Sequence, residues 1–170
     1  MPARPGVCHW SRIGRHLQEC LPVPMLMVAV SRLSSSPSEC LCGRLSSRRT
    51  PLSYADCCGR YIDHWDACPA PDAESLMRSR YTAFVQGNAD YLRATWAAEQ
   101  RPPSVAIEPG VRWLGLEVRS HRPLGEDRAE VEFVARQRDA GGRAHRLHER
   151  SRFVREGGRW FYVDGEFPRG

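Results

Sequence analysis

RLHERSRFVREGGRWFYVDGEF, residues 146–167, predicts two antiparallel strands joined by a tight turn. Gly157-Gly158 separates the strands, and two glycines in succession are typical of a short hairpin turn. In the first strand, alternation places four side chains on one face: Leu147, Glu149, Ser151 and Phe153. The second strand runs from Arg159 to Phe167, so the segment as a whole predicts a β-hairpin.

Two more strands are predicted before this hairpin. Residues 113–120 and 129–138 alternate apolar and polar side chains in the same way. In the earlier strand, the side chains expected on one face are Leu114, Leu116 and Val118. Turn-forming sequences separate the strands at 123–127 and 139–143. The C-terminal part therefore predicts four antiparallel strands.

Two helices are predicted upstream of the strands. The first begins at Asp72, whose carboxylate can cap a helix, and ends at Gly87-Asn88. Its apolar side chains recur every three or four residues: Leu76, Met77, Tyr81, Phe84 and Val85. A shorter helix follows over residues 89–98, before Pro102-Pro103 interrupts the chain. This order predicts an α+β fold with helices packed on one curved, four-stranded antiparallel sheet.

The composition is that of a globular protein with one core of ordinary size. The chain has 170 residues, of which 41% are hydrophobic and 26% charged. All 25 basic side chains are arginines. The absence of lysine excludes a Schiff-base nucleophile, a lysine general base and a P-loop lysine.

The net charge of +5 belongs to the N-terminal third of the chain. Residues 1–60 hold eight arginines and three carboxylates, whereas the charges of residues 61–170 cancel. Four arginines near the cysteines are expected to form a basic surface: Arg44, Arg48, Arg49 and Arg60. Such a surface favours an anionic partner, such as RNA or an acidic protein surface, although a solvated basic arm explains the same composition.

Four of the seven cysteines form two close pairs, Cys40-x-Cys42 and Cys57-Cys58. Zinc takes four thiolate or imidazole ligands, and a site whose four positions are all filled by protein is structural. Clustered thiols suit a metal site in the reducing cytoplasm better than a disulfide framework. Cys68 and His64 are alternative ligands. Unligated thiols are a second interpretation, and vicinal thiols also allow redox exchange.

Residues 1–39 differ from the rest of the chain. We expect a disordered extension, or a start assigned too far upstream with Met25 or Met27 as the true first residue. The apolar stretch 21–30 is too short to span a bilayer, so no membrane association is expected. Basic residues before this stretch leave a signal peptide as an alternative.

Two charged side chains are predicted on apolar faces, Arg80 on the first helix and Glu149 on the third strand. A buried charge is disfavoured unless paired, so we expect an ion pair between them. Three aromatic side chains are expected nearby: Tyr81, Trp96 and Trp113. The pair is either a structural tie, or it makes Glu149 a general base or ligand anchor. Asp164 is expected on the same face as Tyr162, either at the border of the same cavity or as a turn residue at the strand end, whereas His148 points to the opposite face.

Four segments carry a resemblance to a known family: LMRSRY at 76–81, WLGLEV at 113–118, LHERSRF at 147–153 and GRWFYVDG at 158–165. They resemble YchJ-like proteins of the UPF0225 type, and the resemblance runs from about Cys40 to Phe167. It implies a SEC-C-type zinc knuckle over 40–68 and a nuclear transport factor 2-like cone over 69–170. The implied zinc ligands are Cys40, Cys42, Cys57 and Cys58. The segment between the two pairs is longer than the family pattern, by residues 44–50, but a longer loop closes at small entropic cost.

The resemblance implies a fold and a metal site without a reaction. SEC-C knuckles resemble the interacting tail of the bacterial preprotein-translocation motor, so the first hypothesis is a non-enzymatic zinc-containing adaptor for a protein or ribonucleoprotein. The second is a small-molecule-binding protein or enzyme with a pocket around Glu149 and Arg80. The third is nucleic-acid binding through the basic N-terminal part, with an affinity that falls steeply as salt rises.

Overall fold

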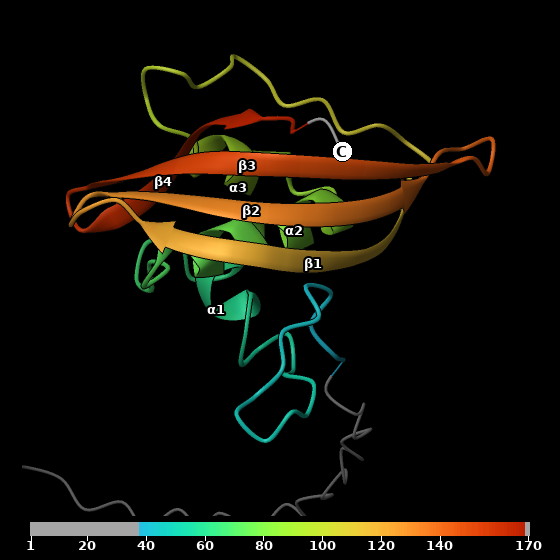
Figure 1. Cartoon of the computed structure of the whole chain (residues 1–170), viewed down its shortest axis with the longest axis horizontal. Coiled ribbons are helices and arrows are strands. Elements are labelled where there is room, and N and C mark those ends of the chain that lie inside the picture. The colour runs from blue at the N-terminus through green and yellow to red at the C-terminus, as the bar shows by residue number, and fades with distance from the viewer. Residues whose placement is uncertain (1–37, 169–170) are drawn as a thin grey trace, which may run out of the picture. The chain divides into compact units, whose positions relative to one another are not determined.

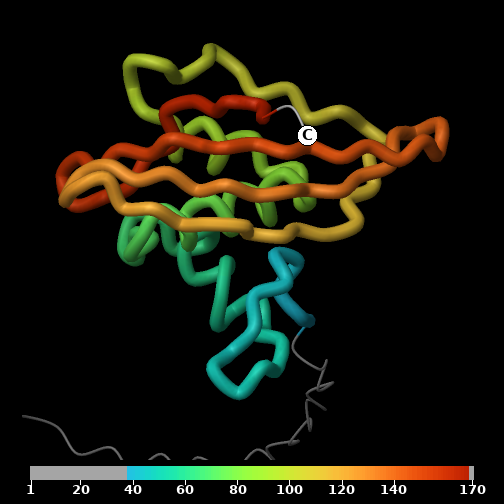
Figure 2. Tube along the Cα trace, in the orientation of Figure 1, coloured from blue at the N-terminus to red at the C-terminus, as the bar shows by residue number. Residues whose placement is uncertain are grey.

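The computed structural model describes residues 38–168. Four strands form one antiparallel sheet in the order β1-β2-β3-β4: Arg112–Pro123, Arg128–Arg138, Ala144–Glu156 and Arg159–Glu166. Three helices precede the sheet: α1 Gly59–Ile62, α2 Ala73–Gln86 and α3 Ala89–Ala94. Figure 1 shows the helices gathered on one face of the curved sheet, and Figure 2 shows the same chain path as a tube. The predicted α+β class and the four-stranded antiparallel sheet are confirmed.

Local signals define the long helix α2. The carboxylate of Asp72 accepts a hydrogen bond of 2.7 Å from the backbone N–H of Ser75, which satisfies a free donor of the first turn. The helix ends at Gly87, whose φ of 74° is left-handed, a conformation that glycine adopts at little cost. Both ends agree with the sequence prediction.

The helix α3 is shorter than predicted, because the residues after Ala94 pair with the sheet instead. The backbone N–H of Tyr162 donates to the carbonyl of Thr95 at 2.9 Å, and that of Ala97 donates to the carbonyl of Tyr162 at 2.7 Å. These bonds join the segment to β4, and they occupy the carbonyl of Thr95 and the N–H of Ala97 that a longer helix would use.

The strand β1 departs from strict alternation. Trp113 pairs with Gln137 and Gly115 pairs with Arg136, so Leu114 is an extra residue in a β-bulge. The bulge turns Leu114 outward, where 45% of it is exposed, and turns Trp113 toward the helices. The prediction that Leu114 shares a face with Leu116 and Val118 is therefore wrong.

The core lies between the helices and the inner face of the sheet. Leu76 of α2 is fully buried, and Val131 of β2 and Phe153 of β3 belong to the same buried cluster. The outer face of the sheet carries ion pairs between neighbouring strands, such as Arg150 with Glu132 at 3.0 Å, and His148 lies 2.8 Å from Glu132 on the same face. The predicted outward direction of His148 is therefore confirmed, and most charged side chains of the sheet lie on this outer face, with Glu149 as an exception on the inner face.

Within residues 38–168, no helix is long and apolar enough to cross a membrane. The expectations for residues 1–39 fall almost entirely outside the described residues. Glu39 is described, and it forms an isolated antiparallel bridge with Ser53.

Candidate metal centre and cavity

A short hairpin brings the two cysteine pairs together. The backbone N–H of Cys40 donates to the carbonyl of Leu52 at 2.8 Å, and that of Leu52 donates to the carbonyl of Arg44 at 3.2 Å. Ser46 and Thr50 close the tip with a backbone bond of 2.8 Å. The lengthened segment 44–50 is therefore a hydrogen-bonded hairpin, and its extra residues project beyond the cysteines without separating them.

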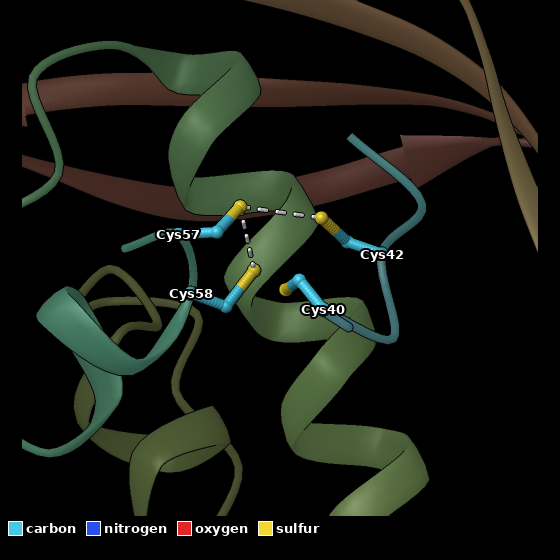
Figure 3. Close-up of side chains that lie close together, drawn as sticks. All are labelled: Cys40, Cys42, Cys57 and Cys58. Carbon is cyan, nitrogen blue, oxygen red and sulfur yellow. Dashed lines mark hydrogen bonds between the residues drawn. The ribbon is translucent and has the colours of Figure 1, made fainter. Parts of the chain in front are cut away.

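A tight turn places the second pair. The backbone N–H groups of Cys57 and Gly59 both donate to the carbonyl of Tyr54, at 3.1 and 2.8 Å. A Cβ at position 59 would lie 2.7 Å from a ring carbon of Tyr54, so the turn requires glycine there. Cys58 precedes α1 directly, and the turn thus directs two adjacent thiols toward Cys40 and Cys42 (Figure 3).

The four sulfur atoms form a compact buried cluster. All lie within 4.8 Å of one another, with Cys42 Sγ 3.6 Å from Cys57 Sγ and Cys57 Sγ 4.0 Å from Cys58 Sγ. All four are free thiols, and none is more than 5% exposed. Four thiolates around zinc, with Zn–S bonds of about 2.3 Å, would lie about 3.8 Å apart. The donor set and the spacing therefore fit a tetrahedral zinc ion.

The four thiols of the cluster differ in pKa. Hydrogen bonds from Cys42 first, and then from Cys57 and Cys58, hold the pKa of Cys40 below its ordinary value. The bond with Cys40 raises the pKa of Cys42, but bonds from Cys57 and Cys58 bring it to about 7. The pKa of Cys58 is raised, mainly by its bond to Cys40. Such a cluster favours negative charge on the first pair, which is the form that binds a metal.

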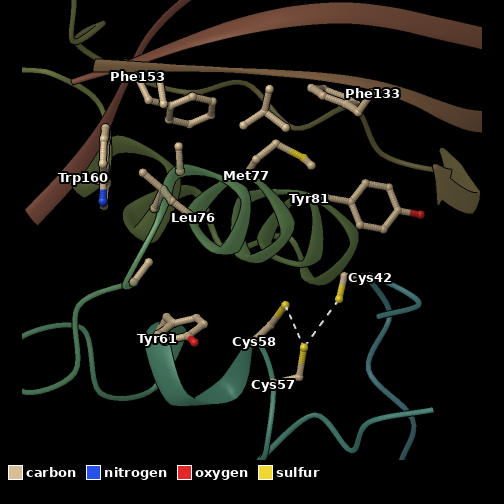
Figure 4. Close-up of a cluster of buried hydrophobic side chains, with 14 of the residues drawn as sticks. Cys42, Cys57, Cys58, Tyr61, Leu76, Met77, Tyr81, Phe133, Phe153 and Trp160 are labelled. Carbon is tan, nitrogen blue, oxygen red and sulfur yellow. Dashed lines mark hydrogen bonds between the residues drawn. The ribbon is translucent and has the colours of Figure 1, made fainter. Parts of the chain in front are cut away.

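The cluster is fixed to the helix α2. Arg78 donates to the carbonyl of Cys42 at 3.2 Å and pairs with Glu74 at 2.7 Å. Arg44 donates to the hydroxyl of Ser75 at 2.8 Å. Figure 4 shows α2 between the cysteines on one side and Phe133 and Phe153 of the sheet on the other. The cysteines and the sheet residues belong to one buried cluster.

The four arginines predicted as a basic surface fall into two groups. Arg44 is half-buried and held by Glu74 and Ser75. Arg48 and Arg49 are exposed at the hairpin tip, and Arg60 is exposed at the start of α1. Three of the four are therefore available to solvent beside the cysteine cluster.

A cavity of about 240 Å³ lies between α2 and the inner face of the sheet. Five of the six predicted pocket residues line it: Arg80, Glu149, Tyr81, Trp96 and Trp113. Arg80 is 6% exposed, and its Nη1 donates at 2.6 Å both to the carbonyl of Leu92 and to Thr95 Oγ1. Its guanidinium carbon lies 4.5 Å from the ring centroid of Tyr162. Burial lowers the pKa of Arg80 to about 10.

Glu149 is 8% exposed, and its Oε1 accepts hydrogen bonds from Ser151 Oγ at 2.7 Å and Tyr162 Oη at 3.1 Å. The predicted direct ion pair with Arg80 is not formed among the described residues. Arg80 is drawn instead to the carbonyl at the end of α3, and Tyr162 contacts both charged groups.

Asp164 does not border this cavity. It pairs with Arg152 on the outer face of the sheet, at 2.5 and 2.6 Å. Arg152 pairs with Asp164 and Phe153 pairs with Tyr162, so Val163 is an extra residue in a β-bulge of β4. A bulge moves the following side chain to the opposite face, so the prediction that Asp164 shares the face of Tyr162 is wrong.

Two residues of this site were missed in the sequence. Tyr162 contacts both charged groups, and Gly165 leaves the space that Glu149 occupies, because a Cβ there would lie 2.2 Å from Glu149 Oε1. Both belong to the segment GRWFYVDG, where a glycine inside a strand was the available signal for a close contact.

The fold and the cluster define a class of protein. It is a small NTF2-like α+β domain whose long helix contacts a four-cysteine knuckle. The family model described as the YchJ middle NTF2-like domain matches residues 72–165. A UPF0225 protein of Polaromonas sp. is 66% identical over 127 residues, which cover 75% of this chain and 91% of the relative. The chain belongs to the YchJ-like, UPF0225 family.

Two solved structures have a similar fold. A SEC-C motif containing protein from Rhodopseudomonas palustris is 33% identical, with a TM-score of 0.66, over 78% of this chain and all of that protein. A second such protein, from Psychrobacter arcticus, is also 33% identical, with a TM-score of 0.63, over 78% of this chain and 84% of that protein. The predicted family and its SEC-C motif are confirmed.

Proposed function

We propose that this protein is a zinc-containing binding protein, in which the zinc is structural and the knuckle carries the contact surface. One observation carries the proposal: four buried thiols lie within 4.8 Å of one another, in a spacing that fits tetrahedral zinc. Four protein ligands leave no coordination position for a substrate, so the ion would supply folding energy. Thiolate ligands persist in reducing compartments, which supports a cytoplasmic location.

The position of the cluster indicates what the ion would stabilise. Cys40 and Cys42 belong to the hairpin, Cys57 and Cys58 to the turn before α1, and Arg78 joins the hairpin to α2. Zinc would hold the hairpin and the turn together, and Arg78 joins them to α2, so the exposed hairpin tip would keep a defined orientation.

Metal analysis of the purified full-length protein tests the zinc. We expect about one zinc per chain, and loss of the metal when Cys42 and Cys58 are both changed to serine. Cobalt substitution should give the thiolate-to-metal absorption of a tetrahedral site. Cys68→Ser is the matched control, because Cys68 lies outside the four-sulfur cluster, and it should retain the metal. A folded wild type that binds neither metal would refute the proposal.

The contact surface that we propose is the hairpin tip with Arg48 and Arg49, extended by Arg60, and its partner is an acidic protein surface. Exposed arginines attract acidic groups over several ångströms and raise the rate of association. The tip is held by the Ser46–Thr50 bonds and is therefore presented as one rigid surface.

Charge reversal tests this surface. The double variant Arg48→Glu, Arg49→Glu should keep its zinc but lose binding to poly-glutamate, used as a probe for an acidic protein. The matched control reverses Arg138 and Arg143, which are exposed at the far hairpin of the sheet, and should bind like the wild type. Equal binding by both variants would refute the proposal. Preferential binding of single-stranded RNA, falling steeply with salt, would support the nucleic-acid hypothesis instead.

A further inference from the structure

The cavity between α2 and the sheet contains two opposite charges that do not neutralise each other directly. Arg80 of α2 and Glu149 of β3 both line it. Both are almost fully buried, at 6% and 8% exposure. A buried charge is costly unless it is paired, so two such groups without a direct ion pair need a separate explanation.

Arg80 has hydrogen-bond donors that no described group of the protein uses. Its Nη1 is used by Leu92 and Thr95, at 2.6 Å each, and the rings of Tyr162 and Trp96 lie 4.5 and 5.2 Å from its guanidinium carbon. These contacts hold the guanidinium plane in place. Within residues 38–168, Nε and Nη2 donate no hydrogen bond and no carboxylate pairs with this side chain. A fixed guanidinium with adjacent free donors is suited to a carboxylate.

Glu149 has one carboxylate oxygen, Oε2, that no described group of the protein uses. Its Oε1 is used by Ser151 and Tyr162, whereas Oε2 accepts no hydrogen bond from the described part of the chain. Gly165 backs the carboxylate, since any Cβ there would push it away. An anchored carboxylate with one free oxygen is suited to an ammonium or a hydroxyl group.

The remaining walls are mostly apolar, with Gln137 as a further polar side chain. The cavity is lined by side chains from α2, β1, β2 and β3, among them Met77, Phe84, Trp113, Phe133, Leu147 and Phe153. Figure 4 shows Met77, Phe133 and Phe153 in the space between helix and sheet. At about 240 Å³, the cavity is smaller than the roughly 300–1,000 Å³ of pockets for drug-sized ligands. This volume limits the ligand to about the size of one amino acid.

We propose that this cavity binds a small amino acid or hydroxy acid with an apolar or aromatic side group. The carboxylate of the ligand would bind Arg80, its ammonium or hydroxyl group would bind Glu149 Oε2, and its side group would lie against the apolar walls. Tyr162 separates the two charged groups, since it contacts Arg80 with its ring and Glu149 with its hydroxyl. The proposal does not depend on zinc or on the hairpin surface.

Isothermal titration of the full-length protein tests the proposal with three probes: L-phenylalanine, 3-phenylpropionate, which lacks the ammonium group, and phenethylamine, which lacks the carboxylate. We expect one saturable site for L-phenylalanine, and binding of the other two that is at least roughly tenfold weaker. No binding of L-phenylalanine up to about 10 mM would overturn the proposal.

Two variants localise the site. Glu149→Gln keeps an acceptor for Ser151 and Tyr162 but removes the charge. It should weaken the binding of L-phenylalanine by roughly tenfold, and leave the affinity for 3-phenylpropionate unchanged or higher. Ala135→Leu fills the cavity from β2, so it should abolish binding of L-phenylalanine without lowering the melting temperature. Binding that survives Ala135→Leu, or that weakens equally for both acids in Glu149→Gln, would overturn the proposal.

Discussion

Replacement of Gly165 by alanine should destabilise the protein through Glu149. A Cβ at this position would lie 2.2 Å from Glu149 Oε1 and 2.7 Å from its carboxyl carbon, which is far inside van der Waals contact. The backbone of Gly165 is held by its pairing with Ser151 in the neighbouring strand. The carboxylate therefore has to move, rather than the strand.

The cost follows from the bonds that the carboxylate would lose. Oε1 accepts from Ser151 at 2.7 Å and from Tyr162 at 3.1 Å, and a hydrogen bond to a charged group contributes about 1.5–3 kcal/mol. Alanine recovers about 0.4–1 kcal/mol relative to glycine, because it restricts the unfolded chain. We therefore expect the free energy of unfolding to fall by about 2–5 kcal/mol.

A double-mutant cycle measured by urea unfolding separates this effect from a general intolerance of the strand. In a Glu149→Ala background the methyl group has space, so Gly165→Ala should change the free energy of unfolding by less than about 1 kcal/mol. Gly141→Ala is a control in an exposed turn, where the nearest atom is a carboxylate oxygen 3.3 Å away, and it should be nearly neutral. An equal cost of Gly165→Ala in both backgrounds would refute the steric explanation.

Two further predictions concern stability. Asp72→Ala removes the 2.7 Å bond to the backbone N–H of Ser75 and should lower the free energy of unfolding by about 1 kcal/mol in urea; an unchanged midpoint would contradict the capping role. Burial raises the pKa of Tyr81 from 10.0 to about 12, so the fold favours the neutral phenol. Stability from this group should be complete below pH 10 and be lost as the pH rises from 10 to 12. Tyrosinate absorbance follows the ionisation of the phenol. The variant Tyr81→Phe should remove this group's part of the loss of stability at alkaline pH.

Much of the fold could be predicted from short-range patterns. The cap at Asp72 and the left-handed end at Gly87 depend on residues within one helical turn. The turn at Gly157-Gly158 depends on backbone freedom that only its own residues provide. The types and pairing of the four cysteines likewise indicated a metal site before any geometry was known.

Strand faces could be predicted only up to the first bulge. Leu114 and Val163 are extra residues opposite the partner strand, and each shifts the side chains around it to the other face. The alternation of side chains along one strand does not show where that strand has an extra residue relative to its partner. Trp113 was nevertheless placed near the cavity, whereas Asp164, which follows the bulge at Val163, was placed on the wrong face.

The sequence by itself determined the order of helices and strands, the four thiols and the burial of Arg80 and Glu149, because these depend on residue type and periodicity. Only the tertiary structure decided the partners of the two buried charges. Arg80 turns to the end of α3 and Glu149 to Tyr162, since these groups belong to neighbouring elements, 12 and 13 residues away along the chain. Hydrogen-bond geometry across such distances depends on packing, which no local pattern specifies.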